Sequence, residues 1–233
     1  MKFTAASHWS THDANRIGSS KHWLSKLSLQ VRLDQFKVFT KLLKPRPRTR
    51  ILDVGTTPNE SLPDSNFFEQ AYLYPQQLQI ASVENCQPLV SKYHLAGFTK
   101  IKPGKSLPFA DQQFDIVTSW ATLEHVGSWA DQKFFLAELA RVGKKIFVTT
   151  PDKYCIFEPH TQVFFWHWLP IFWYRRWLNL RHNQFWANPE NWNPLGQNDL
   201  KRILPAHCQC LPYRSWGWLP SHLLVYKLAT SAS

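Results

Sequence analysis

Short apolar segments alternate with longer stretches of helical character, and this alternation limits the fold of the chain more than any other feature. The apolar segments cover residues 50–55, 78–83, 98–102, 114–119 and 145–150. They contain few polar positions, as is typical of parallel strands that are buried on both faces of a sheet. The sequence therefore predicts an α/β fold, with a mostly parallel sheet and helices on both faces.

Two segments show the spacing of an amphipathic helix. In residues 25–43 the apolar side chains Leu29, Leu33, Phe36, Phe39 and Leu43 follow one another at intervals of three or four and so share one face. Prolines at positions 45 and 47 end this helix. Residues 130–142 have the same spacing. Beyond residue 206, the segments 208–213 and 223–228 predict a final pair of strands.

The positive charge of the chain is concentrated near its N-terminus. The net charge is +11, and residues 1–50 contain 11 Lys and Arg against two Asp, a balance of +9, whereas residues 51–233 add only +2. We therefore expect a basic N-terminal helical arm over residues 1–47 and the α/β domain over residues 48–233. Such an arm can bind the phosphates of nucleic acid or of anionic lipid, or it can be an ordinary solvated helix face.

Motifs for targeting, disulfide formation and metal binding are not evident. The first 25 residues lack the apolar stretch of a signal peptide, and no uncharged apolar run approaches the length of a membrane-spanning helix. The four cysteines are too few and too scattered for a disulfide framework, which favours a cytoplasmic protein with reduced thiols. Cys208 and Cys210, next to His207, lack a second ligand pair at zinc-site spacing, so no metal site is expected.

Polar residues stand at the ends of the predicted strands, where parallel sheets bind their ligands. Near the end of the first strand, Gly55 lets the backbone approach a ligand, and Asp53 can bind an ammonium group or brace the loop. Glu84 ends the second strand, where an acid can bind the two hydroxyls of a ribose. Glu124 and His125 follow the fourth strand. A histidine there can accept a proton near neutral pH, or it can make a structural hydrogen bond.

Four motifs occur in a fixed order: RILDVG, SVEN, GKSLPFADQQFDIV and SWATLEHVG. In this order and spacing the sequence resembles the class I S-adenosylmethionine-dependent methyltransferases, in particular the type 11 group, over roughly residues 48–205. The resemblance implies a Rossmann-like methyltransferase fold with a seven-stranded sheet, and it makes residues 48–233 a methyltransferase domain. It also implies S-adenosylmethionine as the cofactor and methyl transfer as the activity.

The resemblance further implies which residues surround the cofactor and the reacting groups. Those assigned to the cofactor are Asp53, Gly55, Thr56 and Thr57 at its methionine end, Glu84 and the adjacent Asn85 at the ribose, Lys105, Ser106 and Leu107 along the adenine, and Trp120 and Ala121 beneath it. The catalytic candidates that would face the methyl group and the substrate are Glu124 and His125. His160 is a third candidate from its own position, because the run Glu-Pro-His-Thr at residues 158–161 follows the fifth strand, where a substrate wall or a helix N-terminus is expected.

The turn after the first strand departs from the family pattern. Thr57 and Asn59 stand where the family has further glycines, and Pro103 stands near the position of an acid that often binds the adenine amino group. Without these glycines the loop must follow a different path. A non-catalytic binding protein with this fold is therefore one alternative function. An RNA-binding or RNA-modifying protein is another, although nucleic acid is the less favoured partner because residues 51–233 are nearly charge-balanced.

An aromatic-rich insertion is expected at about residues 152–195. Its densest part, residues 163–177, combines Phe, Trp and Tyr with Arg175 and Arg176. This composition is consistent with an apolar lid over a substrate pocket, with peripheral binding to an anionic membrane, and with stacking on single-stranded RNA. We expect a small-molecule or lipid-linked acceptor that is methylated on a hydroxyl oxygen. The sequence indicates no oligomeric state.

Overall fold

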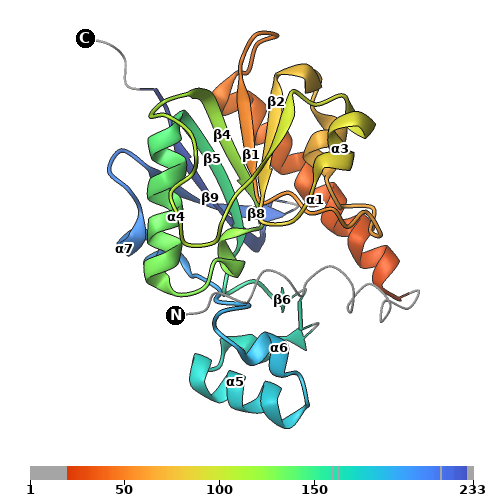
Figure 1. Cartoon of the computed structure of the whole chain (residues 1–233). Coiled ribbons are helices and arrows are strands. Elements are labelled where there is room, and N and C mark those ends of the chain that lie inside the picture. The colour runs from red at the N-terminus through yellow and green to blue at the C-terminus, as the bar shows by residue number, and fades with distance from the viewer. Residues whose placement is uncertain (1–19, 159, 162, 216, 230–233) are drawn as a thin grey trace. The chain divides into compact units, whose positions relative to one another are not determined.

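The computed structural model describes residues 20–158, 160–161, 163–215 and 217–229 (Figure 1). Residues 1–19 of the expected basic arm lie outside the described residues. The chain divides into two compact units. Unit 1 comprises Met1–Thr118 with Val142–Lys145, and unit 2 comprises Ser119–Arg141 with Ile146–Ser233.

Seven strands form one sheet in the order β3-β2-β1-β4-β5-β9-β8. They are β1 (Ile51–Val54), β2 (Leu78–Ser82), β3 (Gly97–Lys100), β4 (Phe114–Trp120), β5 (Gly143–Pro151), β8 (Gln209–Ser215) and β9 (Leu219–Lys227). β1 is parallel to β2 and β4, and β2 is parallel to β3, whereas β9 is antiparallel to both β5 and β8. The predicted mostly parallel, seven-stranded sheet is confirmed, and so is the final strand pair.

In unit 1, helix α1 (Ser20–Leu43) packs against the short helix α2 (Phe67–Ala71). Phe39 and Leu43 are fully buried, and the ring of Phe39 meets that of Phe68 edge to face at a centroid distance of 5.6 Å. The rest of the predicted apolar face, towards the N-terminus of the helix, is only partly buried. The C-terminal part of α1 is therefore the part that the core of unit 1 holds.

The end of α1 is fixed by a distant lysine. The helix stops before Pro45, as predicted, and Lys44 takes a positive φ of 49°. Nζ of Lys145 donates to the carbonyl oxygen of Leu43 at 3.0 Å. A cation at this position satisfies one of the last helix carbonyls and interacts favourably with the helix dipole.

The remaining helical segments of unit 1 are short: η3 (Pro75–Gln77) and α3 (Gln87–Tyr93). All four residues of β1 are buried, because this strand lies between β2 and β4. The edge strand β3 is partly exposed. The position of β1 within the sheet explains why its sequence, ILDV, is almost continuously apolar.

Unit 2 contains more helical segments and a small hairpin. These are η4 (Leu123–His125), α4 (Trp129–Val142), β6 (Phe157–Glu158), β7 (Val163–Phe164), η5 (Trp166–Trp168), α5 (Ile171–Leu180), α6 (Gln184–Ala187) and α7 (Gln197–Ile203). The centre of β5 pairs with β9, and Val148 lies opposite Val225, both fully buried. α4 buries Leu136 and Leu139.

The segment between β5 and α7 has a core of its own. Tyr174 and Leu178 of α5, Ala187 of α6 and Trp192 are buried against one another. The hydroxyls of Tyr174 and Thr161 lie 2.5 Å apart, which links α5 to the loop between β6 and β7. Among the described residues, no helix has both the length and the apolar character needed to cross a bilayer.

Candidate active site

The turn after β1 in unit 1 begins with a conformation that suits glycine. Gly55 has a φ of +107°, a value that residues with a side chain rarely adopt. Its N–H donates to the carbonyl oxygen of Ala81 on the neighbouring strand β2 at 2.9 Å. Thr57 and Asn59, by contrast, do not have positive φ values. The glycines that the family pattern places there are therefore not needed for the path that this loop takes.

Side-chain hydrogen bonds hold the loop instead. The Thr57 hydroxyl accepts the N–H of Asn59 at 3.2 Å and lies 3.4 Å from Oε2 of Glu84, to which it can donate. Oδ1 of Asn59 in turn accepts the N–H of Ser61 at 2.9 Å. The loop thus connects directly to Glu84, the half-buried acid beyond the end of β2.

The side chain of Asp53 contacts the turn after β1 through a hydroxyl of that turn. Its carboxylate is buried, accepts a hydrogen bond from the Thr118 hydroxyl at 2.6 Å, and lies 3.1 Å from the hydroxyl of Thr56. That same hydroxyl lies 3.0 Å from Oε1 of the buried Glu69. One hydroxyl proton cannot serve two carboxylates. Burial, and then the repulsion from Glu69, raises the pKa of Asp53 well above its usual range, and burial also raises the pKa of Glu69.

This carboxyl pair predicts a stability that falls as the pH rises. Because both pKa values are higher in the folded than in the unfolded state, the folded state binds more protons above about pH 4, where unfolded carboxyls ionise. The stabilisation is complete below that pH and is lost as the pH rises through the raised values. We expect Glu69→Gln to weaken this loss and to raise the free energy of unfolding at pH 8.

Urea unfolding of the wild type and Glu69→Gln between pH 5 and pH 8 measures the difference. Glu190→Gln, a change at an exposed acid, is the matched control and should follow the wild type. If the difference between the wild type and Glu69→Gln is constant over this range, the carboxyl pair does not share a proton.

Of the remaining unit 1 candidates, three are exposed and one is buried. Oδ1 of Asn85 accepts the N–H of Gln87 at 3.2 Å, at the start of α3. In the loop after β3, Lys105 and Ser106 are exposed, and Leu107 is buried. Each of these residues stays a candidate for contact with the cofactor. The side-chain oxygen of Asn85 already accepts a hydrogen bond from the first turn of α3.

In unit 2, a strained residue marks the end of β4. Ala121 has a φ of +50°, and its N–H donates to the carbonyl oxygen of Thr149 at 2.9 Å. Left-handed backbone at a non-glycine residue costs about 1–2 kcal/mol and is found preferentially at functional sites. The preceding Trp120 is 8% exposed and packs on Phe147 at a ring distance of 5.2 Å. Its indole is therefore largely covered by protein.

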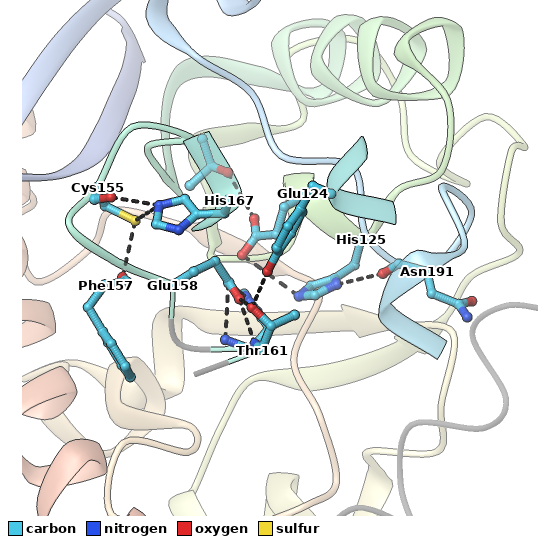
Figure 2. Close-up of polar contacts among 11 residues, drawn as sticks. Glu124, His125, Cys155, Phe157, Glu158, Thr161, His167 and Asn191 are labelled. Atoms are coloured by element: carbon cyan, nitrogen blue, oxygen red, sulfur yellow. Dashed lines mark hydrogen bonds and ion pairs between the residues drawn. The ribbon is translucent and has the colours of Figure 1, made fainter. Parts of the chain in front are cut away.

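The three catalytic candidates lie together in unit 2. Figure 2 shows two of them, Glu124 and His125, with the side chains that surround them. Glu124 is 1% exposed, and its Oε2 accepts a hydrogen bond from the Thr150 hydroxyl at 2.9 Å. Nε2 of His125 lies 3.8 Å from Oε1 of Glu124. The rings of His125 and His160 meet at a centroid distance of 4.9 Å. Sequence proximity explains the first two residues, whereas only the fold brings His160 to them.

Two acceptors orient the imidazoles. Nδ1 of His125 lies 2.9 Å from the carbonyl oxygen of Asn191, and Nδ1 of His160 lies 2.6 Å from Oε1 of Glu158. Because a carbonyl can only accept, Nδ1 of His125 carries the proton. Burial lowers the pKa of His125, although Glu124 opposes this shift. The neutral ring therefore directs a basic Nε2 toward Glu124.

Glu158 is a site residue that the sequence analysis missed. It is 3% exposed, and it accepts hydrogen bonds from the backbone and the hydroxyl of Thr161 as well as from His160. Burial alone would raise the pKa of Glu158, but the His160 ring and these hydrogen bonds outweigh burial and lower it. Its place in the motif Glu-Pro-His-Thr was visible in the sequence, but only its hydrogen bonds show what it does.

The segment that contains Glu84 and Glu124 matches a known family. Residues 70–146 match the family model described as a methyltransferase domain, type 11. Over this segment, a third of the chain, the protein is similar to methyltransferases of the type 11 group. Its cofactor is S-adenosylmethionine, as expected. The turn after β1 and His160 lie outside the matched residues. The match therefore says nothing of their roles, which are argued from the geometry of the structure.

Solved structures confirm the fold of this methyltransferase. A protein of Pyrococcus horikoshii is 12% identical, with a TM-score of 0.57 over 95% of this chain and 100% of that chain. The CurJ carbon methyltransferase is 14% identical, with a TM-score of 0.53 over 84% of this chain and 53% of that chain. At such low identity the likeness shows the fold alone. No curated protein matches the sequence.

The residues in unit 1 fit the nucleoside part of the cofactor. Gly55 provides the turn in which a backbone can approach a ligand. Glu84 lies at the end of a central parallel strand, where an acid can accept hydrogen bonds from ribose hydroxyls, and Thr57 holds its carboxylate. The replacement of glycines by Thr57 and Asn59 is therefore compatible with this cofactor.

Proposed function

We propose that the protein methylates a hydroxyl oxygen of an apolar, lipid-linked acceptor at an anionic membrane surface. The observation that carries the proposal is the cluster of Glu124, His125 and His160, in which two imidazoles lie beside a buried carboxylate. A hydroxyl is a poor nucleophile until its proton is removed or its oxygen is polarised. This cluster supplies groups that can do so.

Within unit 1, Gly55, Thr57 and Glu84 would hold the cofactor. When bound, S-adenosylmethionine supplies a methyl carbon that is activated by a positively charged sulfur. The contribution of the protein is to position the acceptor, because alignment of the reacting atoms accounts for much of the rate of such a transfer. The contribution of the cluster is to prepare the acceptor oxygen, since Nε2 of a neutral histidine can accept the hydroxyl proton.

A cavity near the cluster supports an acceptor with an apolar part. It has a volume of about 360 Å³ and is lined by Thr161, Val163, Trp177, Leu178, Arg181 and Asn183. The guanidinium of Arg181 lies over the Trp177 ring, 5.2 Å from its centroid. Thr161 connects the two sites, because it follows His160 and hydrogen-bonds Glu158. The lining combines three apolar residues with two polar ones and one cation, which suits an amphiphilic acceptor with an apolar chain and an anionic group.

The surface of the same segment supports membrane contact. Eight large apolar side chains between residues 164 and 180 are exposed: Phe164, Phe165, Trp166, Trp168, Leu169, Phe172, Trp173 and Leu180. We call these residues the aromatic patch. Arg176 and Arg181 are exposed on the same segment. Aromatic rings beside guanidinium groups are typical of surfaces that lie at the level of lipid headgroups. An RNA partner has no comparable support among the described residues.

A labelled methyl group tests the proposed function. With S-adenosylmethionine labelled in its methyl group and anionic vesicles made from a whole-lipid extract, we expect the label to appear in the organic phase. The double variant Phe172→Ser with Trp173→Ser should lower this transfer by about tenfold, because it removes two side chains that are 67% and 59% exposed and available to the bilayer. In detergent-dispersed lipid the variant should equal the wild type.

Trp218→Ser, at a tryptophan that is 68% exposed outside the aromatic patch, is the matched control. Vesicle flotation of the three proteins reports binding separately from transfer. Equal flotation of the wild type and the double variant would contradict the proposed binding to the membrane. If the label never enters the organic phase, the acceptor is not linked to a lipid.

A further inference from the structure

One oxygen of Glu124 is buried, and none of the residues that the structure describes forms a hydrogen bond with it. The side chain is 1% exposed, and Oε2 accepts a hydrogen bond from Thr150, whereas Oε1 is the oxygen left over. An unpaired carboxylate oxygen without water is costly, and such a group usually marks a missing ion or ligand. Oε1 lies on the side of the carboxylate that faces His125 (Figure 2).

The separation of 3.8 Å between Oε1 of Glu124 and Nε2 of His125 is too long for a hydrogen bond. Nδ1 of His125 carries its proton toward the carbonyl oxygen of Asn191, so Nε2 of the neutral ring has a lone pair. Two electron-rich atoms therefore lie close together, one on a buried carboxylate and the other on a ring that is 20% exposed. A cation between them would remove their repulsion.

His160 is oriented in the same manner by Glu158. Its Nδ1 lies 2.6 Å from Oε1 of Glu158, whose carboxylate is held in place by Thr161. Histidines that bind metals almost always donate their other ring N–H to a carboxylate or a backbone carbonyl, which fixes the tautomer and the ring. His125 has the carbonyl and His160 has the carboxylate.

We propose that Glu124, His125 and His160 bind one divalent transition-metal ion. One ligand atom from each lies within 4.8 Å of the other two. Ligands at about 2.0–2.2 Å from a shared ion lie about 3–3.6 Å apart, so modest side-chain rotations close the site. The sequence analysis expected no metal, since the only spacing it considered was that of Cys208 and Cys210. His125 and His160 are separated by 35 positions and form no local spacing motif.

The ligand set indicates the class of ion. Two imidazole nitrogens and one carboxylate oxygen suit Zn²⁺, Fe²⁺, Co²⁺ and Ni²⁺ better than Mg²⁺ or Ca²⁺, which prefer oxygen. Three protein ligands leave at least one position open, as in catalytic rather than structural sites. An acceptor hydroxyl bound there would have a lowered pKa, and the histidines would act as ligands instead of bases. This consequence, unlike the binding site itself, rests on the proposed methylation of a hydroxyl.

Titration of the full-length, EDTA-treated protein with Co²⁺ tests the site, and Zn²⁺ competition then gives the affinity. We expect one ion per chain, with visible absorption bands typical of nitrogen and oxygen ligands and a rise in melting temperature with Zn²⁺. Losing an outer partner of a metal ligand costs about 10- to 100-fold in affinity. His160→Asn, which removes a ligand, should therefore weaken binding by about 100-fold or more.

His182→Asn changes an exposed histidine of the same unit and should bind as the wild type does. Glu124→Gln is the second variant, since it keeps the shape of the side chain and removes the charge, and it too should lose the ion. Circular dichroism of the metal-free variants shows that they are folded. The proposal is overturned if no ion binds, or if binding survives in both His160→Asn and Glu124→Gln with the near-ultraviolet band of cysteine thiolate ligation.

Calorimetry with S-adenosylhomocysteine on the metal-free protein separates this proposal from the proposed function. Nucleoside binding without metal binding would overturn the metal site alone. Metal binding without nucleoside binding would overturn the proposed function and leave the metal site standing.

Discussion

Exchanging Glu84 for glutamine should weaken the binding of S-adenosylhomocysteine by about 10- to 100-fold. A carboxylate at the end of β2 can accept hydrogen bonds from both ribose hydroxyls, whereas the amide offers only one acceptor oxygen and no charge. Hydrogen bonds to a charged group are worth about 1.5–3 kcal/mol, which corresponds to this loss of affinity. Isothermal titration calorimetry of the two proteins measures it.

Glutamine is the informative replacement because its oxygen can still accept the hydrogen bond from Thr57, which is 3.4 Å from the carboxylate in the wild type. The loop after β1 should therefore keep its path, and the melting temperature should hardly change. Glu190→Gln controls for the loss of one negative charge. An unchanged affinity in Glu84→Gln would show that this acid does not hold the ribose. No binding by the wild type would favour the non-catalytic alternative.

Alanine in place of Trp192 should lower the free energy of unfolding of its surroundings by about 3–5 kcal/mol. Trp192 is 2% exposed and is the largest fully buried side chain of the described residues. It contacts the Tyr174 ring at a centroid distance of 5.9 Å within the small core of α5 and α6. Its removal leaves a cavity that so small a core cannot fill.

Hydrogen exchange followed by mass spectrometry tests this prediction locally. Peptides that cover α5 and α6 should lose protection in Trp192→Ala, whereas peptides from β1 and β2 in unit 1 should not. Trp173→Ala is the matched control in the same segment, because its ring is 59% exposed. Equal protection in the two variants would mean that the segment does not depend on this core.

The periodicity of the sequence was sufficient to predict most of the fold. The strands at residues 51–54, 78–82 and 114–120 were predicted within two residues, because strands buried on both faces are apolar almost throughout. The aromatic segment was less predictable. Tyr174 and Leu178 are buried, whereas Phe172 and Trp173 are exposed, and composition alone does not distinguish a core aromatic from a surface aromatic.

The candidate site was predicted in part, and the reason lies in sequence distance. Glu124 and His125 follow a strand, so the topology alone predicts their position. Glu69 shares the Thr56 hydroxyl with Asp53, and it comes from a segment with no chemical motif of its own. Glu158 stands two positions before His160, but nothing in the sequence shows that it orients that ring. Only the folded chain shows that these acids face a partner. The supporting partners of a site are harder to predict than its principal residues for this reason.

The hydrogen bond between Thr57 and Glu84 makes these two positions interdependent. Where a turn owes its path to glycine, the residues around it are free to vary, because the backbone alone holds the shape. In this protein the turn after β1 is held by a hydrogen bond between the hydroxyl of Thr57, beyond β1, and the carboxylate of Glu84, beyond β2. A substitution at either position therefore alters what the other can tolerate, so attempts to redesign this loop should change the two residues as a pair.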